Sequence, residues 1–317
     1  MNFMNQGFWG KIKKPFFILA PMMDVTDSPF RQIVAKCGKP DVFYTWFVSV
    51  DGLCSEGKNN ILDRPNLFLT EKEKPIVVQL FGKDPEKFFE SAKILSKMGF
   101  DGIDINMGCP DKDILKQGAG AELIRNPDLA REIIRETKKG AGKIPVSVKT
   151  RIGYFKKSEI KKWISEILKE KPAAICVHGR TAKQGYGGKS DWKAISEVVE
   201  IAKGSKTLII GNGDVESIED GEIKARESEV SGIMIGRAIL GNPWMFKRNK
   251  KEPSEKEKLA MLVKHAILFE RYYKDKKSFG NFRKYLKCYI SGFQGSKELR
   301  MKLMEAKNAK EIKKIIK

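Results

Sequence analysis

The sequence is poor in the residues that most often build metal sites and disulfides. Only two histidines, His178 and His265, and five cysteines occur in 317 residues. The cysteine count is odd and no Cys-x-x-Cys pair occurs, so we expect no disulfide framework. With so few clustered thiols and imidazoles, we expect no metal site either.

Long apolar runs are also missing. The longest, such as 76–81, are far shorter than the roughly 20 residues that cross a bilayer. The first fifteen residues hold no apolar stretch of signal-peptide length followed by a cleavage site. These absences predict a cytoplasmic protein with no membrane association.

Acidic residues are scarce relative to basic ones, and the imbalance is local. The chain carries 61 Lys and Arg against 40 Asp and Glu, a net charge of +21. Residues 247–317 alone hold 22 basic and 8 acidic residues, a net charge of +14. Such a local excess favours a polyanionic partner, most simply nucleic acid. The alternative is a lysine-rich surface that is only hydrated.

The apolar residues, 41% of the chain, are grouped in short continuous runs that alternate with helical patterns. Continuous hydrophobicity is typical of parallel strands buried on both faces. The predicted strands are 16–20, 42–45, 76–81, 102–106, 145–149, 174–178, 208–212 and 232–236. The predicted helices are 85–98, 128–137, 158–168, 192–202 and 218–226. Eight strands alternating with helices predict an α/β fold, a TIM (β/α)8 barrel.

An open doubly wound sheet is the alternative fold. That fold usually carries a glycine-rich dinucleotide fingerprint after its first strand. Here the first predicted strand runs into Pro21, Met22, Met23 and Asp24, with no glycine. The barrel is therefore favoured.

The composition changes after Trp244. Residues 247–257 form a charged stretch, and only helical patterns follow, at 259–273, 282–291 and 299–316. We expect a barrel domain over residues 1–246 and a small, basic, all-α C-terminal domain over residues 247–317.

Polar residues occur where the predicted strands end, which is where barrel enzymes carry their active sites. Gln79 interrupts an apolar strand, and Lys149 and His178 each end one. Two glycine-rich turns, Gly211-Asn212-Gly213-Asp214 and Gly236-Arg237, follow the seventh and eighth strands. Exposed N–H groups in such turns bind phosphate, and these two loops are a recurrent phosphate site in barrels. The pattern predicts a phosphorylated cofactor.

These segments, taken in order, resemble the tRNA-dihydrouridine synthase family over about residues 16–247, with a weaker likeness in the tail. The resemblance rests on Ala20-Pro21-Met22, Gln79-Leu80-Phe81-Gly82, Asn106-Met107-Gly108-Cys109-Pro110, Lys149-Thr150-Arg151, Val177-His178-Gly179-Arg180-Thr181, Gly211-Asn212-Gly213-Asp214 and Met234-Ile235-Gly236-Arg237. It implies an FMN-bearing barrel and a helical RNA-binding domain. It also implies an oxidoreductase acting on a CH–CH group: the C5=C6 bond of uridine in tRNA is reduced, and NADPH (or NADH) restores the reduced flavin.

The resemblance also assigns roles. Hydride would pass from flavin N5 to C6, and Cys109 would protonate C5; the alternative for Cys109 is a small buried apolar residue. The expected FMN-binding residues are Pro21, Met22, Met23, Gln79, Lys149, His178, Asn212, Gly213, Asp214, Gly236 and Arg237. The expected RNA contacts are Arg180, Lys183, Arg283, Lys284, Lys287 and Arg300, with Tyr186 and Trp192 lining the path of an extruded base. We expect a monomer.

The chain departs from the family at three places. Trp46 replaces a common glutamate, Met23-Asp24 replaces a common Ala-Gly pair, and Ser190 replaces alanine. Two other functions remain open from the residues: a flavin barrel acting on a small molecule, and a non-catalytic RNA-binding protein.

Overall fold

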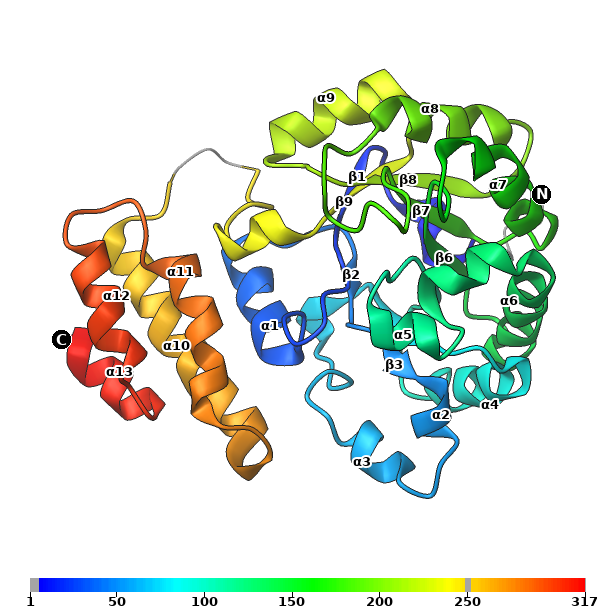
Figure 1. The fold of residues 1–317 in the computed structure, drawn as a ribbon. Helices are drawn as coiled ribbons and strands as arrows, with labels where there is room; N and C mark the ends of the chain where they lie inside the picture. The colour runs from blue at the N-terminus through cyan, green and yellow to red at the C-terminus, as the bar shows by residue number, and fades with distance from the viewer. Residues whose placement is uncertain (1–5, 249–251, 317) are drawn as a thin grey trace.

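The computed structural model describes residues 6–248 and 252–316, and within them a parallel sheet forms a closed barrel (Figure 1). The strands are β1 (Phe16–Leu19), β2 (Phe43–Tyr44), β3 (Val48–Ser49), β4 (Ile76–Phe81), β5 (Gly102–Met107), β6 (Val146–Arg151), β7 (Ala174–His178), β8 (Leu208–Asn212) and β9 (Gly232–Ile235). Their order is β1-β9-β8-β7-β6-β5-β4-β2, and β3 pairs with β4. A parallel bridge between Ile18 and Val42 joins the two ends, so the sheet closes. The predicted TIM barrel is confirmed.

The second barrel position holds two short strands in place of one. β2 pairs with the start of β4 and β3 with its end. Between them, the side chain of Asn66 takes the place of a strand neighbour: Trp46 N donates to Asn66 Oδ1 (3.1 Å), and Asn66 Nδ2 donates to Trp46 O (3.1 Å). Counted as one interrupted strand, β2 and β3 complete the eight predicted positions.

Helices surround the barrel (Figure 1); the five predicted ones are present, and a further helix over 28–37 was not predicted. They are α1 (Ser28–Cys37), α4 (Pro85–Leu95), α6 (Pro127–Ala141), α7 (Ile160–Lys169), α8 (Trp192–Ile201) and α9 (Ile218–Ser228), with the short α2 (Val50–Leu53), α3 (Lys58–Leu62) and α5 (Lys112–Lys116) in loops. Asp84 caps α4 by accepting from the N–H of Glu86 (3.0 Å), and proline occupies the first turn, where its missing N–H costs nothing.

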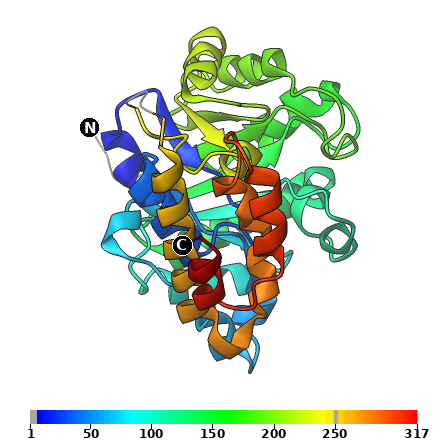
Figure 2. The same cartoon turned by 90° about the vertical axis from the view of Figure 1, so that its left-hand side faces the viewer.

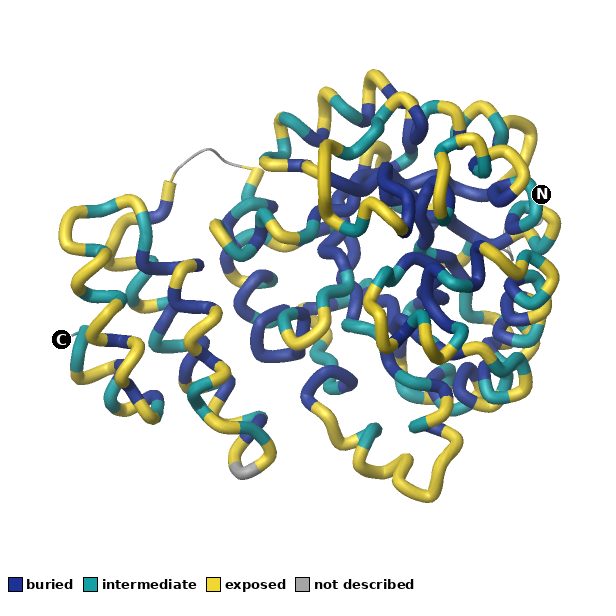
Figure 3. The backbone as a smooth tube through the Cα atoms, viewed as in Figure 1, coloured by how far each residue is buried: buried dark blue, intermediate teal, exposed yellow. Residues whose placement is uncertain are grey.

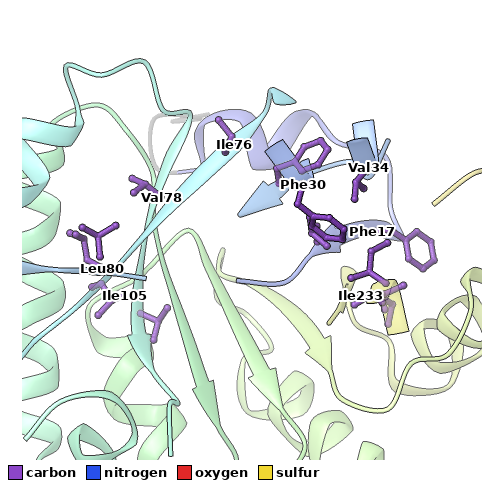
Figure 4. Close-up of a cluster of buried hydrophobic side chains, with 14 of the residues drawn as sticks. Phe17, Phe30, Val34, Ile76, Val78, Leu80, Ile105 and Ile233 are labelled. Atoms are coloured by element: carbon purple, nitrogen blue, oxygen red, sulfur yellow. The ribbon is translucent and has the colours of Figure 1, made fainter. Parts of the chain in front are cut away.

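The barrel has an outer and an inner core. The outer core fills the space between strands and helices, and Figure 4 shows part of it around Phe17, Phe30 and Ile105. The inner core holds the alternate, inward-facing residues, including Phe16, Tyr44 and, from the short helix Gly7–Lys11, Trp9. Figure 3 shows the strands as the buried centre of the molecule. Near the carboxyl ends of the strands, the inward positions become polar.

A tail of helices follows the barrel (Figure 2). It contains α10 (Glu255–Tyr273), a 3-10 segment (Phe279–Tyr285), α11 (Leu286–Tyr289), α12 (Ser296–Met304) and α13 (Ala309–Ile316). The helical pattern over 299–316 is therefore two helices, and the predicted stretch 247–257 lies partly outside the described residues. α10 packs against α1, and His265 lies among the rings of Phe30 (5.7 Å between centroids) and Tyr285 (4.5 Å). Burial lowers the pKa of His265 to about 3, so this histidine is a neutral core residue.

Candidate active site

An open pocket of about 1,700 Å³ lies at the carboxyl ends of the strands. All twelve residues predicted for catalysis and cofactor binding line it: Pro21, Met22, Met23, Gln79, Cys109, Lys149, His178, Asn212, Gly213, Asp214, Gly236 and Arg237. They come from most of the barrel strands and from the loops that follow them, which explains why residues far apart in sequence meet.

A buried chain of polar side chains underlies this pocket, and two of its members, Gln79 and Asn106, form the floor. Ser147 Oγ donates to Asp104 Oδ1 (2.6 Å), and Gln79 Nε2 donates to Asp104 Oδ2 (2.7 Å). Asn106 Nδ2 then donates to Gln79 Oε1 (3.1 Å). Complete burial raises the pKa of Asp104 to about 6, although both hydrogen bonds oppose the shift. The network fixes the amide of Gln79 at the base of the pocket.

Asn106 connects this floor to the loop that carries Cys109. Its Oδ1 accepts from the N–H of Gly108 (3.1 Å) and from the N–H of Cys109 (2.9 Å). The carbonyl of Cys109 in turn accepts from Ala121 N (3.0 Å). Burial raises the pKa of the half-buried Cys109 thiol above its ordinary value of 9.0. At neutral pH the group facing this pocket is a protonated thiol held on a fixed backbone.

Lys149, on β6, lies next to Asn106, its register neighbour on the adjacent strand β5, and lines the pocket. Its Nζ donates to Asn212 Oδ1 (3.1 Å), while Asn212 Nδ2 donates to Met234 O (2.8 Å) and is thereby oriented. Burial lowers the pKa of Lys149 from its ordinary value of 10.5. A lysine with one amide partner keeps two N–H donors for a ligand.

His178 is a neutral imidazole of one tautomer. Burial lowers its pKa to about 2, and Lys149, Arg151 and Arg180 nearby add to the shift. Its Nε2 lies 3.2 Å from Nη1 of Arg180, and a guanidinium can only donate, so Nε2 accepts. The ring proton therefore resides on Nδ1.

The loop after β7 is held by an ion pair between the buried Arg180 and the partly exposed Asp214. Arg180 Nη1 and Nη2 donate to Asp214 Oδ1 (3.0 Å) and Oδ2 (2.7 Å), and the Ser190 N–H donates to Oδ2 (2.8 Å). Partial burial alone would raise the pKa of Asp214, but these hydrogen bonds and the charges of Arg180 and Arg237 lower it. Asp214 is an anion that orders two loops.

Gly213 lets the turn after β8 approach this ion pair. Its φ is +122°, and an added Cβ would lie 2.3 Å from Ser190 Oγ and 2.8 Å from the ring of His178. Only glycine fits this backbone. Arg237, at the turn after β9, has an exposed guanidinium 5.1 Å from the ring centroid of Tyr186.

Arg151 is a site residue that the sequence analysis left without a role. Its Nε donates to Gly108 O (2.7 Å), and its Nη1 donates to Thr181 O (3.0 Å) and Gly185 O (2.8 Å). It therefore ties the loop of Cys109 to the loop after β7. Asn106 and Asp104 were missed in the same way, although period-two alternation places them inward beside Gln79.

Two expected RNA contacts, and one residue expected to line the path of the base, have other partners in the structure. Arg180 is only 2% exposed and belongs to the ion pair with Asp214, so it is not a free surface cation. Trp192 does not line the pocket; its Nε1 donates to Gly213 O (3.0 Å) and its ring packs on Gly211. Lys284 reaches back to the carbonyl of Asp24. Tyr186, by contrast, lines the pocket and is 64% exposed.

No cluster of three or more His, Cys, Asp or Glu side chains with the arrangement of a metal site occurs in residues 6–248 and 252–316. Over the same part of the chain, no helix is both long and apolar enough to span a membrane.

The fold and the pocket define a TIM-barrel protein of the enzyme type, in which strand ends bring titratable groups to one opening. Solved structures agree on the fold. A variant of NCR from Zymomonas mobilis is 17% identical with a TM-score of 0.52, covering 73% of this chain and 84% of its own. Morphinone reductase in complex with tetrahydroNAD is 11% identical with a TM-score of 0.52, covering 76% and 89%.

The chain belongs to the dihydrouridine synthase (Dus) family, whose model matches residues 18–317 and thus extends through the helical tail. It is 39% identical to the probable tRNA-dihydrouridine synthase of Staphylococcus aureus (strain COL), over 99% of this chain and 95% of the relative. It is 38% identical to probable tRNA-dihydrouridine synthase 2 of Bacillus subtilis (strain 168), over 99% and 96%. The family resemblance is confirmed, and the chain is an oxidoreductase by family.

Proposed function

We propose that this protein is an FMN-dependent tRNA-dihydrouridine synthase that reduces the C5=C6 bond of uridine in tRNA. The observation that carries the proposal is that a protonated thiol, Cys109, and a half-buried lysine, Lys149, line one open pocket. The volume of about 1,700 Å³ exceeds the roughly 300–1,000 Å³ of an ordinary small-molecule site. It leaves room for a flavin and a nucleobase together.

The residues of the pocket fit FMN. The turn at Gly213 leaves no space for a side chain, and the guanidinium of Arg237 is exposed beside it, as a phosphate site requires. Lys149 and His178 offer N–H donors, and Gln79 offers an amide, toward the polar edge of the ring. Pro21, Met22 and Met23 supply apolar wall, and Asn212, Asp214 and Gly236 complete the lining. Bound FMN, reduced by NADPH or NADH, would supply the hydride.

The protein's own side chains supply the proton and hold the proton donor in position. Cys109 donates a proton to C5 of the base, because burial keeps its thiol protonated at neutral pH. Asn106 fixes the backbone of Cys109, and Arg151 fixes the neighbouring carbonyl of Gly108. Lys149 stabilises negative charge that develops in the pocket.

The tail is proposed to be the tRNA-binding domain, residues 247–317, on a catalytic domain of residues 1–246. Its net charge of +14 suits a polyanion. A stacked uracil cannot reach a pocket at a barrel mouth, so the base must leave the stack, and the exposed ring of Tyr186 lies at the rim to receive it. We propose that the enzyme acts as a monomer.

The test is direct. The purified protein, reconstituted with FMN, is incubated with NADPH and unmodified tRNA, and dihydrouridine is mapped by position. We expect flavin absorption bands and dihydrouridine in the tRNA. Reduction of free uracil but not of tRNA would replace this function with a small-molecule reductase, and tRNA binding without any flavin would replace it with a non-catalytic RNA-binding protein.

A further inference from the structure

The loop between β1 and α1 contains a turn with an unusual residue at its tightest point. Val25 N donates to Met22 O (3.0 Å), which closes a four-residue turn over 22–25. Asp24 is the third residue of this turn and has a φ of +59°. Glycine normally takes such a position, because a Cβ is disfavoured there. Met22, Met23 and Val25 of the same turn line the pocket.

Side chains of the helical tail form hydrogen bonds and an ion pair with this turn. Lys277 Nζ pairs with Asp24 Oδ1 (2.9 Å), and Lys284 Nζ donates to Asp24 O. Tyr285 OH lies 3.0 Å from both Asp24 O and Val25 O and donates to them. Three side chains of the tail therefore converge on Asp24, whose neighbours Met22, Met23 and Val25 line the pocket. The carboxylate of Asp24 provides the partner for Lys277 that a glycine would lack.

The same loop is fixed a second time where α1 begins. Tyr273 OH donates to Asp27 Oδ2 (2.7 Å), and Asp27 Oδ1 caps α1 by accepting from Phe30 N (2.9 Å). Arg31 pairs with Glu73 (2.7 Å), with both side chains fully buried, and donates to Thr26 O (2.7 Å). The end of the loop is thus immobilised by barrel and tail together. The turn is also closed within the loop, where Thr26 Oγ1 accepts from Met22 N (3.1 Å), but the side chains that bond to Asp24 come from the tail.

We propose that Tyr285, Lys277 and Lys284 are positioning residues of the cofactor pocket. The tail holds the 22–25 turn in its strained conformation and so sets the wall against which the flavin packs. The tail then contributes to cofactor binding in addition to binding RNA. A substitution of these tail residues is expected to alter the affinity of the protein for FMN. This inference rests on the proposed function, since it takes the pocket to be a flavin site.

Two matched variants test the inference. Tyr285→Phe keeps the ring packing on Phe30 (5.2 Å between centroids) and removes only the hydroxyl that reaches the turn. Tyr289→Phe removes another buried tail hydroxyl, whose partner is His265 Nδ1 (2.9 Å) and not the turn. FMN binding to each apoprotein is measured by quenching of flavin fluorescence, and the visible circular dichroism of the bound flavin is recorded. We expect the dissociation constant of Tyr285→Phe to rise about three- to tenfold, as loss of one hydrogen bond allows, with an altered dichroism. Tyr289→Phe should match wild type in both.

A third measurement does not depend on the cofactor. In the apoproteins, hydrogen exchange in the peptide spanning 22–27 should be faster in Tyr285→Phe than in wild type or Tyr289→Phe, because the N–H groups of Val25 and Thr26 close this turn. Equal exchange in both variants, or equal FMN affinities, would overturn the inference. A wild type that binds no FMN would refute the proposed function instead, and the exchange result would still report whether the tail holds the turn.

Discussion

The proton donated by Cys109 can be tested by removing the thiol without disturbing its loop. Asn106 holds residue 109 through the backbone N–H, and the carbonyl of residue 109 bonds to Ala121 N, so Cys109→Ala keeps both contacts. We therefore expect the variant to fold and to bind FMN as wild type does. General acids contribute about 10²- to 10⁴-fold to rate, so uridine reduction should slow by that factor, about 3–5 kcal/mol of activation free energy.

The assay is a single turnover. The flavin is reduced without oxygen, tRNA is added, and the return of the oxidised flavin band is followed by stopped flow. The matched control is Cys54→Ala, because Cys54 is exposed, lies outside the pocket and bonds through its thiol to Lys87 O (3.6 Å) and Ser91 Oγ (3.7 Å). Wild-type rates for Cys109→Ala, with tRNA saturating, would refute the acid role.

The pH profile gives a second criterion. Burial raises the pKa of the Cys109 thiol above 9.0, so the acid is fully protonated at neutral pH. The rate of reduction in wild type should be level through neutral pH and should fall only as pH rises through that elevated pKa. The residual rate of Cys109→Ala should lack this alkaline decline. A decline that begins near pH 7 would contradict the environment assigned to the thiol.

Four further outcomes are expected. Asn106→Ala leaves the N–H groups of Gly108 and Cys109 without their acceptor, and urea denaturation should show a loss of about 2–4 kcal/mol in the free energy of unfolding. Burial raises the folded-state pKa of Asp104 to about 6, so the contribution of Asp104 to the free energy of unfolding is greatest below pH 4 and falls as pH rises to 6. Asp104→Asn should remove this pH dependence from unfolding curves measured between pH 4 and 6. The same pH dependence in variant and wild type would contradict the raised pKa. ¹⁵N NMR should find His178 neutral with its proton on Nδ1 from pH 5 to 8, and any titration there would be inconsistent with its burial. Binding of tRNA should weaken steeply with salt, since Lys and Arg displace counterions from phosphates, and a flat response would argue against the basic tail as the RNA site.

Much of the barrel could be predicted because a buried parallel strand is apolar throughout its length. The segments at 76–81, 174–178 and 208–212 match β4, β7 and β8 residue for residue. The interruption of the second strand could not be foreseen. It depends on the amide of Asn66, which lies twenty residues beyond Trp46 and meets it only in the folded chain.

The site could be predicted where a polar residue lies at or near the end of an apolar strand, as His178 does in β7 and Lys149 does in β6. What the sequence did not reveal was the hydrogen-bond or ion-pair partner of each polar side chain. Arg180 resembles a surface cation in the sequence, but it is buried because Asp214, 34 residues away, neutralises it. Asp104 looked like one more acidic residue, and only the closed barrel places it between Ser147 and Gln79. Sequence patterns place a residue on a strand end, whereas long-range pairing decides whether it faces a ligand or another side chain.

The contacts around Asp24 also bear on how such proteins can be recombined. A barrel with glycine at this position has no carboxylate to offer, and a foreign set of C-terminal helices need not carry a cation at position 277 or a phenol at 285. A chimaera joined within residues 247–257 would then leave Asp24, whose backbone is in the left-handed conformation, without these contacts beside the pocket. Whoever exchanges these helices between relatives to retarget the enzyme should transplant the short stretch after β1 along with them.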